Sequence, residues 1–319
     1  MNEKLRLLQQ EVSKTVVGNE TAVSGIFTAL LAGGHVLLES APGSGKTSLA
    51  VTAAKAMGLE SNRLNLSPDT QDSDILGNVV LDKESGKIRY RKGAIYTNIF
   101  IAEYFDEAPG SAASIITDIM DDGKLNVGGK PIPLPSPFAV IATVERESPF
   151  TEPLALEERD RFMIRLPLAY LNGRETVTLI KRNTGAVTMP EDMTSGPVMG
   201  PQDIIEMREA VREVALPDET LQYISDIAKA SEAHHAVKQG ITHRGIVDIA
   251  EMARARAYIA GKATASAEDV RAVLGMTIGH RMELYPEAKV FGESYETVVE
   301  DLIKKVRAPK PEKKGGDRE

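Results

Sequence analysis

The sequence predicts an α/β protein: a parallel β-sheet core with helices on both faces, followed by a small all-α domain. Three observations support this prediction. Short apolar runs alternate with amphipathic stretches from about residue 20 to residue 168, which is the pattern of buried strands and crossover helices. The glycine-rich segment S-A-P-G-S-G-K-T at 40–47 follows one of these runs. Beyond Asn172-Gly173 the strand signals stop, and apolar residues recur at helical spacing.

Four apolar runs are expected to form the buried strands: residues 35–39, 62–66, 98–102 and 137–143. Two further segments of the first domain are expected to be inserted hairpins. One covers residues 79–90 and turns at 84–86, and the other covers residues 124–134 and turns at 128–129. The core therefore alternates strands with helices, and the hairpins are additions to it.

The second domain shows helical patterns only. Apolar residues from Ile246 onward follow a helical period, and Ser266 with Asp269 resembles a capping box, which predicts a helix that begins near Ala267. The C-terminal tail combines proline, glycine and mixed charge, a composition typical of partial disorder. We expect three parts: residues 1–172 as the α/β domain, 173–285 as the helical domain, and 286–319 as a C-terminal extension.

Composition restricts the kind of protein and its environment. The chain of 319 residues has no cysteine, which excludes disulfides and thiolate zinc sites. No apolar run approaches the roughly 18–20 residues that cross a bilayer, and the opening MNEKLRLLQQ lacks the segments of a signal peptide, so we expect a cytoplasmic protein with no membrane contact. The net charge of −8 argues against binding to nucleic acid, because such proteins usually present a basic surface.

The segment at 40–47 is typical of a phosphate-binding loop (P-loop), because it follows a predicted strand and opens a predicted helix. Gly43 and Gly45 allow the backbone to curl so that its amides point at phosphate oxygens. We expect Lys46 to reach the β- and γ-phosphates of ATP and the Thr47 hydroxyl to bind Mg²⁺. Ser40 departs from the motif, which has glycine there. The residues expected to bind the nucleotide are Ser40, Ala41, Pro42, Gly43, Ser44, Gly45, Lys46, Thr47 and Ser48.

The residues around this loop resemble the MoxR family of AAA+ ATPases. The resemblance is visible in GGHVLLE before the loop, in RKGAIYTN, APGSAASIITDIM and TEPLALEERDRF after it, and in GITHRG and HR in the second domain. It covers roughly residues 16–285. It implies an α/β domain with a helical lid, assembled as a homo-oligomeric ring, usually a hexamer, with ATP between neighbours. It also implies a chaperone-like role on a protein partner, possibly one with a von Willebrand factor A domain.

The same resemblance assigns roles to two arginines and to the hairpins. Arg161, in the Asp160-Arg161-Phe162 motif, would be the arginine finger that reaches the ATP of a neighbouring subunit. Arg244 would be the sensor arginine of the lid, so that ATP would join the two domains through Lys46 and Arg244. Such arginines neutralise charge in the transition state of phosphoryl transfer. Both hairpins would match the family insertions that face a ring pore or a partner.

The chain departs from the family pattern where hydrolysis is concerned. The family expects an Asp that helps to hold Mg²⁺ and then a Glu that activates water, and these positions hold Glu103 and Tyr104. Glu103 is expected to reach the metal through a bound water. The acidic pair Asp106-Glu107 follows three residues later, and either it is a displaced catalytic pair or it lies in an acidic turn. Glu145 replaces an expected asparagine, and our hypothesis is that it serves as the base or polarises the water.

Four functions are therefore weighed. The leading one is a MoxR-like ATPase with slow hydrolysis that remodels or assembles a partner protein. The second is an ATP-binding scaffold or regulatory subunit without hydrolysis, which Glu103, Tyr104 and Glu145 would explain. A nucleic-acid motor conflicts with the acidic composition. A small-molecule kinase would explain the P-loop but not Arg161 and Arg244.

Overall fold

The structure of the protein is a computed structural model that describes residues 3–81, 88–127, 129–145, 154–185 and 196–309. Its main sheet has five parallel strands in the order β2-β5-β8-β1-β9. The strands are β1 (Val36–Ser40), β2 (Ser61–Asn65), β5 (Ile99–Glu103), β8 (Ala139–Glu145) and β9 (Ile164–Pro167). The four expected strands are confirmed, each shifted by one or two residues. The edge strand β9 was not predicted, because it is short, ends in a proline and contains Arg165.

Both faces of the sheet are buried, as side-chain alternation along the strands requires. Leu38 and Ile101 face one core, which α1 (Glu3–Ser13), α2 (Glu20–Ala32) and α3 (Lys46–Ala56) cover. Leu37 and Phe100 face the other core, which α4 (Asp72–Leu76) and α5 (Gly110–Asp122) cover. The predicted parallel sheet with helices on both faces is therefore confirmed.

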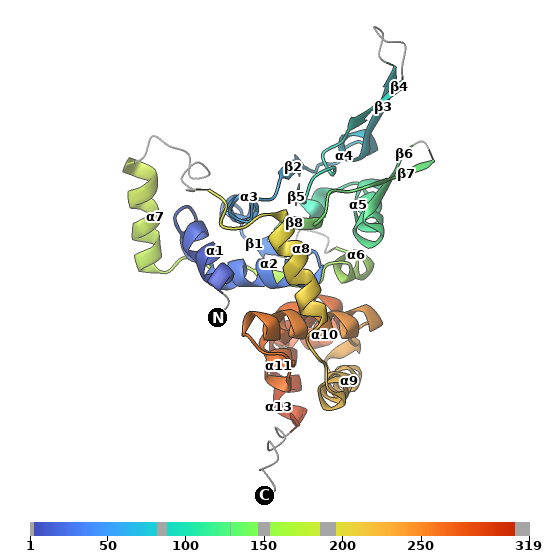
Figure 1. Cartoon of the computed structure of the whole chain (residues 1–319). Coiled ribbons are helices and arrows are strands. Elements are labelled where there is room, and N and C mark those ends of the chain that lie inside the picture. Colours follow the sequence, from blue (N-terminus) through green and yellow to red (C-terminus); the bar gives the residue numbers. More distant parts are fainter. Residues whose placement is uncertain (1–2, 82–87, 128, 146–153, 186–195, 310–319) are drawn as a thin grey trace, which may run out of the picture.

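The two predicted hairpins are present. Strands β3 (Gly77–Leu81) and β4 (Ile88–Lys92) pair antiparallel, with Val79 opposite Tyr90. Strands β6 (Lys124–Val127) and β7 (Lys130–Pro133) pair in the same way. Residues 82–87 and Gly128, where the turns were expected, lie outside the described residues. The β3–β4 hairpin extends away from the body of the molecule (Figure 1).

The second domain has its own core, built mainly from α9 (Asp218–Glu232), α10 (His243–Ile259) and α11 (Ala267–Ile278). Helix α11 begins at the expected residue, and the Asp269 carboxylate accepts the Ser266 amide at 3.0 Å. The domain is not purely helical, because β10 (Val237–Gln239) and β11 (Glu283–Leu284) form a small antiparallel pair. The short 3-10 helix η3 (Gly279–Arg281) lies between α11 and β11.

The structure divides the chain differently from the expected boundaries at 172 and 285. Helix α7 (Gly173–Gly185) lies beside α1, where Arg182 donates to the Ser13 and Lys14 carbonyls at 2.8 and 3.0 Å (Figure 1). Helix α8 (Pro201–Arg212) packs into the first core rather than the second. After α12 (Pro286–Val290), helix α13 (Tyr295–Lys305) belongs to the second core, so only residues 310–319 of the expected extension lie outside the described residues.

Candidate functional site

The P-loop connects the end of β1 to the start of α3. Gly43 and Gly45 have φ angles of +72° and +87°, in the left-handed region that glycine adopts most easily. Ser40 is tolerated where the motif has glycine, because its φ angle is not positive. Among the described non-glycine residues, only Asn19 and Tyr104 have positive φ. The Ser40 hydroxyl instead contacts the Ser44 hydroxyl across the loop. The loop therefore forms without the first glycine of the motif.

The Lys46 ammonium group is held over the loop. It donates to the carbonyls of Ser40 and Ala41 at 2.9 and 3.2 Å. Partial burial lowers the pKa of Lys46, and the negative charges of Glu145, Asp106 and Glu39 oppose that shift. The lysine therefore shares an electrostatic environment with carboxylates from three different segments.

Two cavities meet at this loop. One, of about 310 Å³, is lined by residues 42–48 together with Tyr104, Thr143 and Glu145. The other, of about 500 Å³, lies between residues 39–44 and the segment that follows β9, where Leu168, Leu171 and Leu179 supply apolar wall. The loop cavity presents hydroxyl, ammonium and carboxylate groups and its neighbour presents leucine side chains, which suits the phosphates and the base of a nucleotide. The residues after β9 were not among those expected to bind nucleotide.

Glu103 does not join the loop. It is the last residue of β5 and leans toward the edge strand β2, where its carboxylate lies 3.9 Å from Arg63 Nε. It is not among the residues that line the loop cavity. Tyr104, the next residue, does line that cavity and has a left-handed backbone with φ +53°. The metal role expected for Glu103 therefore has no support in its position.

Of the acidic pair Asp106-Glu107, whose role the sequence left open, Asp106 lies beside Glu145. After the left-handed Tyr104, the 3-10 helix η1 (Phe105–Glu107) brings the Asp106 carboxylate to β8, where it accepts the Glu145 amide at 3.4 Å. Its Oδ1 atom is buried without a hydrogen-bond partner in the described structure. Burial raises the pKa of Asp106, although the charge of Lys46 acts in the opposite direction. Glu107 is exposed and does not line the loop cavity, so the acidic pair separates into one residue that contacts Glu145 and one surface residue.

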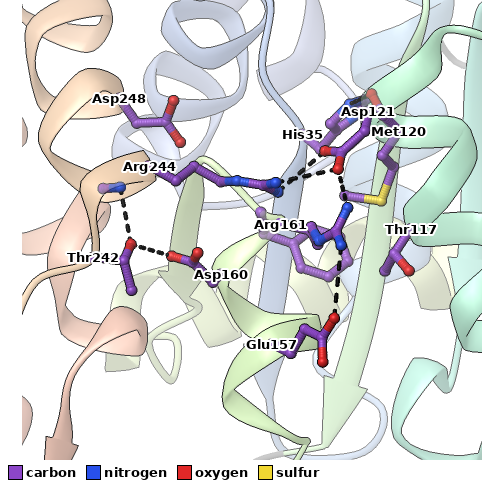
Figure 2. Close-up of polar contacts among 12 residues, drawn as sticks. His35, Thr117, Met120, Asp121, Glu157, Asp160, Arg161, Thr242, Arg244 and Asp248 are labelled. Carbon is purple, nitrogen blue, oxygen red and sulfur yellow. Dashed lines mark hydrogen bonds and ion pairs between the residues drawn. The ribbon is translucent and has the colours of Figure 1, made fainter. Parts of the chain in front are cut away.

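Arg161 and Arg244 converge on a single carboxylate, that of Asp121 near the end of α5 (Figure 2). Arg244 makes a two-pronged contact, Nη1 to Oδ1 and Nη2 to Oδ2, each at 3.1 Å. Arg161 donates to the same Oδ2, and its other nitrogen lies 3.8 Å from Glu157. Sequence reasoning did not identify Asp121. One carboxylate held by two guanidinium groups shows that both arginines reach the same anion.

These arginines lie near the amino-terminal ends of β1 and β9, whereas the P-loop follows the carboxyl-terminal end of β1. The neighbouring Met120 carbonyl contacts His35, the residue before β1, at 3.1 Å. Arg161 precedes β9, whose first residue Ile164 pairs with Val36. Strand β1 then runs from Val36 to Ser40, a rise of about 13 Å at about 3.3 Å per residue. The expectation that Lys46 and Arg244 of one chain hold the same ATP is therefore wrong for this arrangement.

Comparison with known proteins agrees with the fold and the loop. Residues 35–164 match the ATPase family associated with various cellular activities (AAA), and residues 229–302 match the AAA lid domain. The chain is 30% identical to YeaC of Bacillus subtilis (strain 168), over 94% of this chain and 93% of that protein. It is 26% identical to the chaperone MoxR1 of Mycobacterium tuberculosis (strain ATCC 25618 / H37Rv), over 94% of this chain and 81% of that protein.

The chain belongs to the MoxR family of AAA+ ATPases. The crystal structure of a candidate ATPase from Cytophaga hutchinsonii superimposes with a TM-score of 0.87 at 26% identity, over 96% of this chain and 95% of that one. In this MoxR-family protein, none of the helices within the described ranges is long and apolar enough to cross a bilayer.

The residues beside the loop of this MoxR-family chain fit a magnesium ion. Thr47 offers a hydroxyl, and Asp106 and Glu145 offer carboxylate oxygens, which are the donors that Mg²⁺ prefers. Within the described ranges, no cluster of three or more His, Asp or Glu side chains could hold a metal by itself. Mg²⁺ is usually bound through one or two carboxylates together with substrate phosphates.

Proposed function

We propose that this chain binds ATP with Mg²⁺ at the P-loop and hydrolyses it where two copies meet head to tail. The observation that supports this most directly is the placement of the charged groups. The carboxyl-terminal ends of the strands carry Lys46, Asp106 and Glu145. The opposite ends of the strands carry Arg161 and Arg244. A complete set of groups for phosphoryl transfer therefore requires the loop of one copy and the arginines of another.

Nucleotide binding is assigned to the loop and to the start of α3. The amides of residues 43–47 and the helix N-terminus would bind phosphate oxygens, and Lys46 would exchange its carbonyl contacts for the β- and γ-phosphates. The apolar cavity after β9 would take the base. Thr47 and Asp106 would hold Mg²⁺, which when bound would neutralise charge on the phosphate oxygens, and Glu145 would remain free for the attacking water.

For hydrolysis, we assign to Glu145 the acceptance of a proton from the attacking water, because it lines the same cavity as Lys46 and Thr47. The water oxygen would bond to the γ-phosphorus, the bond to the bridging oxygen would break, and ADP and phosphate would leave. Asp106 fixes the backbone of Glu145 through its amide. Tyr104, where the family has a glutamate, is a poor base at neutral pH, so we expect turnover to be slow.

The arginines would act on the ATP of the neighbouring copy. A single arginine supplied in trans contributes about 10³–10⁵ in rate in well-studied phosphoryl-transfer enzymes. Contacts that join one end of the strands to the opposite end are heterologous, and they close into a ring when the rotation allows. A hexameric ring is the assembly we propose, with nucleotide-dependent rearrangement used to remodel or assemble a partner protein, possibly one with a von Willebrand factor A domain. The relative from Mycobacterium tuberculosis is named a chaperone.

The second candidate is an ATP-binding scaffold that does not hydrolyse. The observation that favours it is that Glu103 pairs with Arg63 and that the next residue is Tyr104. These two positions therefore supply neither the metal-binding Asp nor the water-activating Glu of the family.

Two measurements test the proposal. Purified protein is expected to turn over ATP, and Lys46→Ala is expected to abolish both nucleotide uptake in calorimetry and turnover. Mixing Lys46→Ala chains with Arg161→Ala chains should then restore turnover that neither has alone, because the mixed contact combines an intact loop with an intact arginine. ATP uptake without any turnover would favour the scaffold, and absence of uptake would contradict both functions.

A further inference from the structure

A buried cluster behind the two arginines is centred on Arg281, the last residue of η3. The Arg281 side chain is 0% exposed, although a guanidinium is among the groups most costly to bury. Its Nη1 donates to Asp160 Oδ1 at 3.2 Å, and its Nη2 donates to the Phe162 carbonyl at 2.7 Å and to Asp248 Oδ2. One side chain from the second domain therefore contacts two separate segments of the chain.

Those two segments are the ones that present Arg161 and Arg244. Asp160 and Phe162 flank Arg161 directly, so Arg281 contacts the residue on each side of it. Asp248 lies one helical turn beyond Arg244 on α10, on the same face of the helix. Because the guanidinium is a planar and rigid fork, its contacts fix the separation of the two segments.

Further hydrogen bonds join the same segments. Thr242 caps the start of α10, accepting the Gly245 amide at 3.0 Å, and its hydroxyl donates to Asp160 at 2.6 Å (Figure 2). His280 Nε2 contacts the Phe162 carbonyl at 2.7 Å. The chain before β9 and the start of α10 are thus joined by polar contacts on the buried side of the arginine pair.

Stability alone does not account for this cluster. Replacing a buried ion pair with well-packed apolar residues often leaves the free energy of unfolding unchanged or raises it. The buried contacts of Arg281 are therefore better explained by the geometry that they fix. Here the geometry is visible: Arg161 and Arg244 reach the two oxygens of one carboxylate, that of Asp121. Two guanidinium groups at that spacing can also reach one phosphate group.

We propose that Arg281 is a positioning residue, which holds Arg161 and Arg244 at the separation at which both contact one phosphate of the neighbouring copy. This inference rests on the proposed function above. Arg281 itself would touch no nucleotide, because its side chain is fully buried and its hydrogen bonds within the described residues go to Asp160, Phe162 and Asp248.

The test uses full-length chains with Arg281→Gln and separates positioning from damage to the fold. Alone, this variant is expected to lose at least tenfold in ATP turnover, while its own P-loop binds ATP within twofold of the wild type. In an equal mixture with Lys46→Ala chains, turnover should return, because the variant supplies the loop and the partner supplies correctly placed arginines. With random mixing, about a quarter of the head-to-tail contacts are complete, which sets the size of the recovery.

Two further variants complete the design. Arg281→Lys keeps the charge but has no planar fork, and it should lie between the wild type and Arg281→Gln. Arg271→Gln removes another arginine of the second domain, which bonds the Tyr223 hydroxyl at 2.8 Å, and it should leave turnover unchanged. If Arg281→Gln does not fold, the same measurements on Arg281→Lys decide.

The outcomes point to different conclusions. Wild-type turnover by Arg281→Gln would overturn the inference. A second outcome would also overturn it. In that outcome, the mixture of Arg161→Ala with Lys46→Ala regains ATP turnover, but the mixture of Arg281→Gln with Lys46→Ala does not. Failure of the mixture of Arg161→Ala with Lys46→Ala would instead overturn the head-to-tail function, and this inference with it.

Discussion

Protonation of His35 is expected to destabilise the α/β domain in mild acid. His35 is buried before β1, where its Nδ1 accepts the Val140 amide at 2.9 Å and its Nε2 contacts the Met120 carbonyl at 3.1 Å. Since a carbonyl can only accept, Nε2 carries the single proton and the ring is neutral. Burial lowers the pKa of His35 from 6.5 to about 4, and the Met120 carbonyl opposes this shift while Arg208 and Arg244 add to it.

The sign and size of the effect follow from these pKa values. The unfolded chain takes up the proton near pH 6.5 and the folded chain only near pH 4, so the unfolded state binds more protons in that window. The stability is therefore fully present above pH 6.5 and is lost as the pH falls toward 4. At about 1.4 kcal/mol per pKa unit, the loss is about 2 kcal/mol at pH 5 and about 3 kcal/mol at pH 4.

Urea unfolding at pH 7.5 and pH 5 would measure this loss. The control is His35→Asn, which keeps an acceptor toward Val140 but cannot titrate in this range. Other titrating groups are common to both proteins, so the wild type should lose about 2 kcal/mol more than the variant between the two pH values. The same pH dependence in both proteins, or a directly measured pKa near 6.5 for His35, would refute this reasoning.

Three further outcomes are expected. Glu145→Gln should lower turnover by about 10²–10⁴ with little change in ATP affinity, and unchanged single-turnover rates would exclude it as the base. Gly45→Ala should cost about 1–2 kcal/mol and weaken ATP binding, because φ is +87°, whereas Gly33→Ala, at φ +85°, should carry a similar backbone cost in thermal melts without affecting ATP in calorimetry. Thr242→Ala should cost about 0.5–2 kcal/mol through loss of the α10 cap, seen as a lower urea midpoint; an unchanged midpoint would contradict the capping role.

Local signals in the sequence were sufficient for the core of the fold. Apolar runs identified four of the five strands, and the P-loop motif identified the turn from β1 to α3. The start of α11 at Ala267 followed from Ser266 and Asp269 alone, because a cap is decided by a few neighbouring residues. Helical periodicity does not reveal which core a helix joins, and for that reason α7 and α8 were assigned to the second domain.

The site was only partly predictable, because its remaining parts depend on tertiary arrangement. Asp106 reaches Glu145 only because Tyr104 adopts a left-handed backbone, and nothing in the local sequence requires that conformation. Arg244 was expected near Lys46, but the contacts of Arg281 hold the start of α10 against the segment before β9. Asp121 became recognisable only when both arginines were seen to share it.

The separation of the loop from the arginines affects how many complete sites an assembly of copies contains. In a pair related by a twofold axis, the same surface patch of each copy is used, so such a pair completes sites only where the loop and the arginines lie on that one patch. Under the proposed head-to-tail function, a row of copies leaves an unused loop at one end and an unused arginine pair at the other, and therefore has one site fewer than it has members. Among assemblies built by the proposed head-to-tail contact, only a closed ring uses every loop, so the rate per chain should rise as short rows convert into rings.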